Sequence, residues 1–61
     1  MGKMIEVEGF KAFRGKMKVH LPIFKEYTVI AGEWLYMPDQ DCWYCRGRSY
    51  PGEFCEVLHV E

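Results

Sequence analysis

The sequence predicts an all-β fold: a single small barrel of five to six short antiparallel strands, closed or nearly closed. The first observation is that every long apolar pattern alternates with a period of two, as in a strand with one buried face. The second is that proline, glycine and aspartate cluster between these stretches, where they favour tight turns. The third is that no apolar pattern keeps the helical period over a useful length, so we expect no long helix.

Length and composition narrow the class of protein. The 61 residues predict one domain over residues 1–61. A chain of this size buries only about 60% of its unfolded surface and often needs disulfides, a metal or oligomerisation. Its three cysteines, an odd number, favour reduced thiols over a disulfide framework. The net charge of −1 disfavours nucleic-acid binding through bulk charge, because such domains are usually strongly basic.

The chain carries no sign of a membrane or secretory segment. No apolar run approaches the roughly 20 residues of a membrane-spanning helix. The N-terminus becomes acidic at Glu6, too early for a signal peptide. We therefore expect a cytoplasmic protein without a membrane partner.

The first half of the chain predicts two strands with one wet face each. Residues 4–8 place Ile5 and Val7 on one side and two glutamates on the other, and Gly9 either ends this strand or forms a bulge in it. Residues 13–21 give the clearest alternation in the chain, before Pro22 breaks it. The inward face of this strand consists of Phe13, Gly15, Met17, Val19 and Leu21. Its outward face is a basic stripe of Arg14, Lys16, Lys18 and His20.

The third predicted strand, residues 28–37, is apolar on both faces. A bulge at Gly32 and Glu33 is expected to re-aim the side chains that follow it. One face carries Ile30, Trp34 and Tyr36, and the other carries Val29, Ala31, Leu35 and Met37. A small barrel has only one inside, so we expect a partner, a loop or a second copy to cover the other face. Self-association as a homodimer is one such expectation.

Turn residues divide the C-terminal half into further strands. Residues 38–41, with Pro38 at the second turn position, separate two aromatic runs and predict a β-hairpin. A second break at Arg46 and Gly47 precedes another short strand. Pro51 and Gly52 then form a sharp turn before a last strand at residues 56–60.

Residues 42–58, CWYCRGRSYPGEFCEVL, resemble the end of an SH3-like barrel. In that fold a tryptophan-bearing strand and a following strand lead through a proline-containing single helical turn to a final valine-rich strand. The resemblance implies an SH3-like small barrel with a short 3-10 turn near the C-terminus. It does not imply a proline-rich ligand, because the acidic loop of the peptide-binding members is not recognisable upstream.

Residues 32–44, GEWLYMPDQDCWY, are similar to small uncharacterised proteins encoded by bacterial phages and prophages. This similarity implies a phage-encoded accessory protein in the cytoplasm of the host cell. Small accessory proteins of this kind often bind and block a host factor, including components of antiviral defence. The resemblance thus favours a non-enzymatic binding protein with a protein partner.

The aromatic hairpin supplies the candidate binding surface. We expect at least one aromatic residue of each strand to be buried and the others to lie outside, beside arginines, as at many protein interfaces. The candidate binding residues are Trp34, Tyr36, Trp43, Tyr44, Arg46 and Arg48.

Two alternative functions stay open on the sequence. The basic stripe, helped by Arg46 and Arg48, could hold nucleic acid or a nucleotide, as small barrels do with basic and aromatic side chains. A zinc-stabilised structural module would use Cys42, Cys45, Cys55 and His59. The predicted strand disfavours zinc, because Cys42 and Cys45 are three residues apart and would point to opposite faces.

Catalysis is not expected. No serine lies in a nucleophile elbow, and the chain is short for a shaped pocket. His20 and His59 have no evident partner in the sequence, and turn capping explains Asp39 and Asp41. We therefore predict neither an enzyme nor a cofactor.

Overall fold

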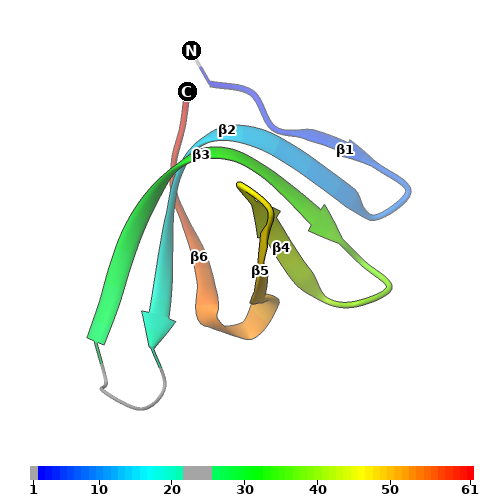
Figure 1. The fold of residues 1–61 in the computed structure, drawn as a ribbon. Helices are drawn as coiled ribbons and strands as arrows, with labels where there is room; N and C mark the ends of the chain where they lie inside the picture. The colour runs from blue at the N-terminus through cyan, green and yellow to red at the C-terminus, as the bar shows by residue number, and fades with distance from the viewer. Residues whose placement is uncertain (1, 22–25) are drawn as a thin grey trace.

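The computed structural model describes residues 2–21 and 26–61, and these residues form an all-β fold (Figure 1). The described elements are β1 (Ile5–Val7), β2 (Phe10–Leu21), β3 (Glu26–Met37), β4 (Cys42–Cys45), β5 (Arg48–Pro51), the 3-10 turn η1 (Gly52–Phe54) and β6 (Cys55–Val60). All strand pairs are antiparallel. The predicted all-β class, strand number and short 3-10 turn are therefore confirmed. Barrel closure and SH3-like character stay predictions.

β2 is the central strand of the sheet. The strand order is β1-β2-β3-β4-β5, and β6 pairs with β2 on the same edge as β1. β1 pairs along residues 10–12 of β2, and β6 pairs along residues 15–19. β2 and β3 form a long curved ribbon with β4, β5 and β6 on its concave side (Figure 1). The two ends of the chain lie close together, where the Lys3 backbone N–H donates to the Glu61 carbonyl at 3.2 Å.

The core fills the concave side of this ribbon. The predicted alternation of β2 is confirmed, because Phe13, Met17 and Val19 are buried while Arg14 and Lys16 are exposed. The rest of the buried apolar set comes from β3 and β4 and consists of Trp34, Cys42, Trp43 and Cys45. The predicted break at Pro22 and the predicted inward side chain of Leu21 lie outside what the structure describes.

The predicted bulge at Gly32 and Glu33 is wrong. β2 and β3 pair without a register shift through this region, with Arg14 opposite Glu33 and Gly15 opposite Gly32. The register shift instead lies in β6, where Leu58 is the extra residue against β2. Glycines in this sheet therefore mark close approach of other parts of the chain, not an irregular strand.

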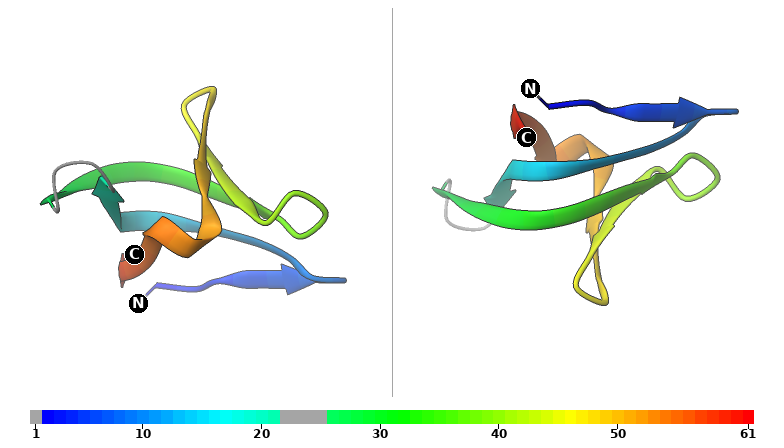
Figure 2. Two further views of the ribbon diagram at one scale, coloured as in Figure 1. Left: turned by 90° about the horizontal axis from the view of Figure 1, so that it is seen from below. Right: turned by 90° about the horizontal axis from the view of Figure 1, so that it is seen from above.

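The predicted turns between the later strands are confirmed. The β3–β4 turn is closed by the Gln40 backbone N–H, which donates to the Met37 carbonyl at 3.3 Å. The β4–β5 turn consists of Arg46 and Gly47, with φ of 53° and 77°. Figure 2 shows this hairpin tip projecting away from the sheet. Among the described residues, no helix is long and apolar enough to cross a membrane.

Candidate binding surfaces

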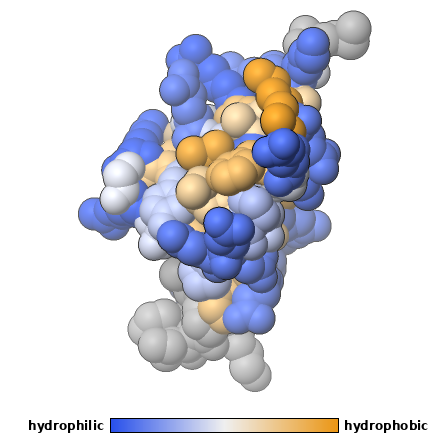
Figure 3. Space-filling model, turned by 90° about the vertical axis from the view of Figure 1, so that its right-hand side faces the viewer, coloured by the Kyte–Doolittle hydropathy of each residue, from blue (hydrophilic) through white to orange (hydrophobic). Residues whose placement is uncertain are grey.

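Apolar side chains cover one end of the convex, outer face of the sheet. The strand register places Ile5, Ala12 and Leu35 in one row across β1, β2 and β3, and it places Val7 opposite Phe10. We call these five residues the outer apolar patch. Ile5 is 58% exposed, Val7 60% and Leu35 42%. Figure 3 shows hydrophobic surface bordered by hydrophilic residues on the side of the molecule that carries the β1–β2 and β3–β4 turns.

The exposure of Ile5 and Val7 corrects the expectation that β1 has only one wet face. β1 pairs with three residues of β2, and no other described element covers its apolar side. The alternation of the sequence predicted a strand here, but it could not tell whether another layer packs on it. The sequence signal for this patch was the doubly apolar third strand, whose outer side includes Leu35.

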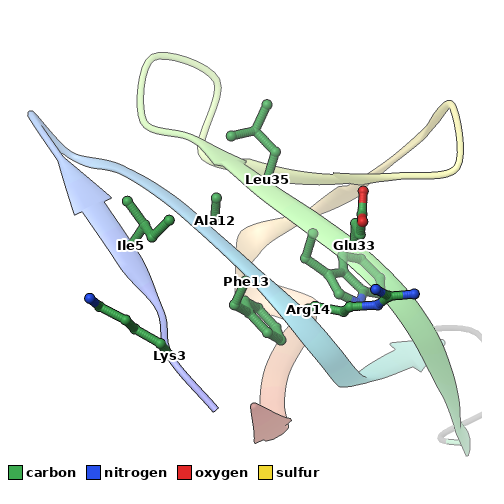
Figure 4. Close-up of a pocket in the computed structure, with 8 residues that line it drawn as sticks. Lys3, Ile5, Ala12, Phe13, Arg14, Glu33 and Leu35 are labelled. Carbon is green, nitrogen blue, oxygen red and sulfur yellow. The ribbon is translucent and has the colours of Figure 1, made fainter. Parts of the chain in front are cut away.

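The outer apolar patch contains an open groove of about 480 Å³. Its lining consists of Lys3, Ile5, Ala12, Phe13, Arg14, Glu33, Trp34 and Leu35. Figure 4 shows Ile5, Ala12 and Leu35 projecting from one side of the sheet and Phe13 from the other. Because the small Ala12 lies between two larger side chains, a hollow forms above its methyl group. Lys3, Arg14 and Glu33 supply charged groups at the ends of this hollow.

Both tryptophans of the predicted binding surface lie in the core. Trp34 is 2% exposed and Trp43 7% exposed. The ring of Trp43 packs edge-on against Phe13, with centroids 5.6 Å apart, and Trp34 packs on Tyr50 at 5.5 Å. The expectation that each strand buries at least one aromatic residue is therefore confirmed. The buried residue is the tryptophan in both strands, so the two tryptophans are removed from the candidate binding surface, because their large apolar area fills the concave side of the sheet.

The two tyrosines of the predicted surface are half-buried and fix the β3–β4 turn. The Tyr36 hydroxyl donates to the Asp41 carboxylate, and the Tyr44 hydroxyl donates to the Gln40 side-chain oxygen. The hydrogen bond to Asp41 is the main cause of a raised pKa of Tyr36. Tyr44 also stands opposite Leu35 in the register, so it borders the outer apolar patch.

Arg46 and Arg48 lie apart from the outer apolar patch, at the exposed tip of the β4–β5 hairpin. They line a second cavity, of about 340 Å³, together with Ile30, Cys45 and Tyr50. The sequence identified the arginines. It missed Ile30 and Tyr50, since nothing in their spacing indicates that β3 and β5 approach one another here.

Three residues of the basic stripe of β2 are exposed and Lys18 is half-buried, and acidic and aromatic residues interrupt the stripe. Arg14 stands opposite Glu33 of β3, and Lys18 stands opposite Glu56 of β6. The Lys18 ammonium also lies 4.1 Å from the centroid of the Tyr27 ring. The stripe therefore offers less net positive charge than its sequence pattern indicates.

The cysteines are free thiols, and the two in β4 lie on opposite faces of their strand. Cys42 pairs with Met37 in the register, whereas Cys45 belongs to the core with Trp43. Burial raises the pKa of the Cys45 thiol, although the nearby Arg46 charge opposes this shift. Across residues 2–21 and 26–61, no three His, Cys, Asp or Glu side chains gather closely enough to hold a metal ion.

Comparison with known proteins adds no relative to this picture, because no protein-family model, curated protein or solved structure matches the chain.

Proposed function

We propose that this protein is a non-enzymatic binding protein that holds a protein partner on its outer apolar patch. The observation that carries the proposal is the row of Ile5, Ala12 and Leu35, which lines a groove of about 480 Å³ on a sheet face that no other described element covers. Exposed apolar patches with a polar rim are typical of protein–protein interfaces.

The chemistry of the groove defines the partner. An apolar side chain of the partner fits above Ala12, between Ile5 and Leu35. Complete burial of a side chain such as leucine contributes about 1.5–3 kcal/mol, and the half-exposed residues here contribute a fraction of that each. The positive charges of Lys3 and Arg14 favour an acidic group of the partner beside this apolar side chain. The negative charge of Glu33 disfavours a second acidic group there.

The resemblance of residues 32–44 to phage and prophage proteins supports one setting for this binding. In that setting the chain is an accessory protein in the host cytoplasm, and its partner is a host factor such as a component of antiviral defence. Occupation of the partner's surface would be sufficient to block it, so no catalysis is required.

The test compares two exposed leucines that receive the same substitution. Leu35 lies in the patch, whereas Leu58, 49% exposed, lies on β6 outside it. We expect Leu35→Asp to weaken the purified partner's affinity by about tenfold or more, because it places a charge in an apolar contact. Leu58→Asp should leave that affinity unchanged. The partner is first enriched from host lysate on wild-type protein and then titrated by calorimetry.

Circular dichroism and the fluorescence of the two buried tryptophans verify that both variants are folded. Equal affinity of wild type and a folded Leu35→Asp variant would rule out the patch as the binding surface. Sedimentation distinguishes a different protein from a second copy of this chain as the occupant of the patch. If wild type forms a dimer that Leu35→Asp dissociates, the occupant is a second copy, as in the predicted homodimer.

The alternative functions have weaker support. Nucleic-acid binding by the basic stripe predicts an affinity that falls steeply with salt, but Glu33 and Glu56 reduce the field there. A zinc-stabilised module predicts unfolding by a chelator. Its candidate pair Cys42 and Cys45 has its side chains on opposite faces of β4.

A further inference from the structure

The second cavity lies between β3 and the β4–β5 hairpin, apart from the outer apolar patch. Its lining combines two cationic residues, Arg46 and Arg48, with the apolar and aromatic side chains of Ile30 and Tyr50. Its volume of about 340 Å³ lies near the lower end of the range for small-molecule sites. The cavity therefore has room for one small ligand rather than for an extended chain.

The turn at the edge of this cavity uses an unfavourable residue. Cys45 pairs with Arg48, so Arg46 and Gly47 form a two-residue turn with φ of 53° and 77°. Such turns strongly prefer asparagine, aspartate or glycine at the first position. An arginine held at positive φ points to a role for its side chain, because the turn itself does not favour it.

Gly32 shows independently where the Arg46 side chain lies. A Cβ atom at Gly32 would lie 3.0 Å from the Cys45 sulfur and 3.5 Å from Arg46 Nε. The Arg46 side chain, although exposed, thus lies over β3 at Gly32. Because Gly32 has no side chain, the Arg46 guanidinium group has room to lie over β3 beside the cavity.

The charge of the cavity has one sign. Its lining contains two guanidinium groups and no carboxylate. The Cys45 thiol stays protonated at neutral pH, because burial raises its pKa despite the charge of Arg46. Paired guanidinium groups bind phosphate or carboxylate through charge-assisted hydrogen bonds. The cavity therefore favours an anion.

The aromatic wall of the cavity favours a planar ligand. Tyr50 is half-buried and packs on Trp34, with ring centroids 5.5 Å apart, so its position is held by the core. Ile30 adds an apolar surface from β3. Rings of nucleobases stack on such aromatic side chains.

We propose that this cavity binds a mononucleotide, with the phosphate between Arg46 and Arg48 and the base against Tyr50 and Ile30. This site goes beyond the protein-binding function proposed above, because none of its residues belongs to the outer apolar patch. It gives the chain a second, small-molecule binding capacity on the concave side of the sheet.

The experiment titrates the isotope-labelled chain with adenosine monophosphate and follows the backbone amides by NMR. We expect saturable shifts at Arg46, Gly47 and Arg48. The variants Arg46→Asn and Arg48→Gln should each weaken binding by about tenfold or more, because each removes a charged phosphate contact. Arg46→Asn suits the turn better than the native residue, and its NMR spectrum verifies that the variant is folded before the affinities are compared.

Lys16→Gln is the matched control. It also removes one positive charge, but from the outward face of β2, away from the cavity, so this variant should bind the nucleotide as wild type does. Inorganic phosphate and adenosine are titrated separately and should each bind about tenfold more weakly than the nucleotide. A lack of saturable shifts up to about 10 mM nucleotide would overturn the proposal. An equal loss in Lys16→Gln, or phosphate binding as tight as that of the nucleotide, would also overturn it.

Discussion

Gly15 is a residue at which the backbones of β2 and β6 approach each other closely. It is buried in β2 and pairs with Val60 of β6. A Cβ atom at Gly15 would overlap the carbonyl oxygen of His59, so the backbone of β6 occupies the space of a side chain. The glycine is needed here for close approach, and no unusual backbone dihedral is involved.

The substitution Gly15→Ala tests this requirement. We expect it to lower the free energy of unfolding by about 1–3 kcal/mol, because the added methyl group forces β6 away from β2. Urea denaturation followed by tryptophan fluorescence measures the change. Ser49→Ala, at an exposed position of β5, is the control and should stay within about 0.5 kcal/mol of wild type. A Gly15→Ala protein as stable as that control would show that β6 can shift without loss.

At the scale of residues, the sequence predicted which side chains of β2 face inward, but it did not predict which aromatic residues of β3 and β4 are buried. Strict alternation decides which of Phe13 and Arg14 faces inward, because one face of the strand is buried. Nothing comparable separates a core tryptophan from a surface tryptophan, since both fit a strand equally well. The sequence therefore predicted one buried aromatic residue in each strand but not which one, and Trp34 and Trp43 stayed among the binding candidates although both lie in the core.

At the scale of elements, the β4–β5 hairpin combines a well-predicted position with an unfavourable turn residue. Arg46 and Gly47 were identified as a break, and the structure gives both a positive φ. An L-residue in the left-handed region loses about 1 kcal/mol or more relative to a right-handed conformation, and asparagine loses less because its short side chain bonds locally.

Arg46→Asn should therefore raise the free energy of unfolding by up to about 1 kcal/mol, which chemical denaturation measures. Gly47→Ala is the companion variant and should lower it by about 1 kcal/mol. A Cβ atom at Gly47 meets no other atom within 4 Å, so only the backbone conformation is tested by that change. A loss of stability in Arg46→Asn would mean that the arginine side chain stabilises the hairpin by packing on β3.

The element-scale predictions succeeded where local chemistry decides and failed where the rest of the fold decides. Proline, aspartate and glycine fixed the turns because their backbone preferences are local. The bulge expected at Gly32 failed because this glycine accommodates Cys45 and Arg46 from a hairpin that follows later in the chain. Similarly, the apolar side of β1 remained exposed because no later element of the described chain returns to cover it.

At the scale of the whole molecule, two surfaces face in different directions from one small core. The outer apolar patch lies on the convex side of β1, β2 and β3, and the arginine-lined cavity lies between β3 and the β4–β5 hairpin. A chain of 61 residues has little core to stabilise both. Its stability should therefore respond measurably to groups whose ionisation differs between the folded and unfolded states.

High pH provides the clearest test of that response. Burial raises the pKa of the Cys45 and Cys55 thiols above the ordinary value of 9.0. Above that pH the unfolded chain releases these protons first, so the folded chain holds more protons, and its stability falls as pH rises. The stabilisation is complete below about pH 9 and is lost as the pH approaches the folded-state values. Raised pKa values of Tyr36 and Tyr44 act in the same direction at higher pH.

We expect the urea midpoint to be constant near about pH 7 and to fall as the pH rises above about 9. Cys45→Ala should be less stable at neutral pH, because it leaves a cavity in the core, but its midpoint should fall less steeply with pH than that of wild type. This difference in slope separates the ionisation of the buried thiol from general alkaline denaturation. A wild-type midpoint that does not change over this range, or parallel slopes in the two proteins, would show that the thiol does not ionise differently in the folded and unfolded states.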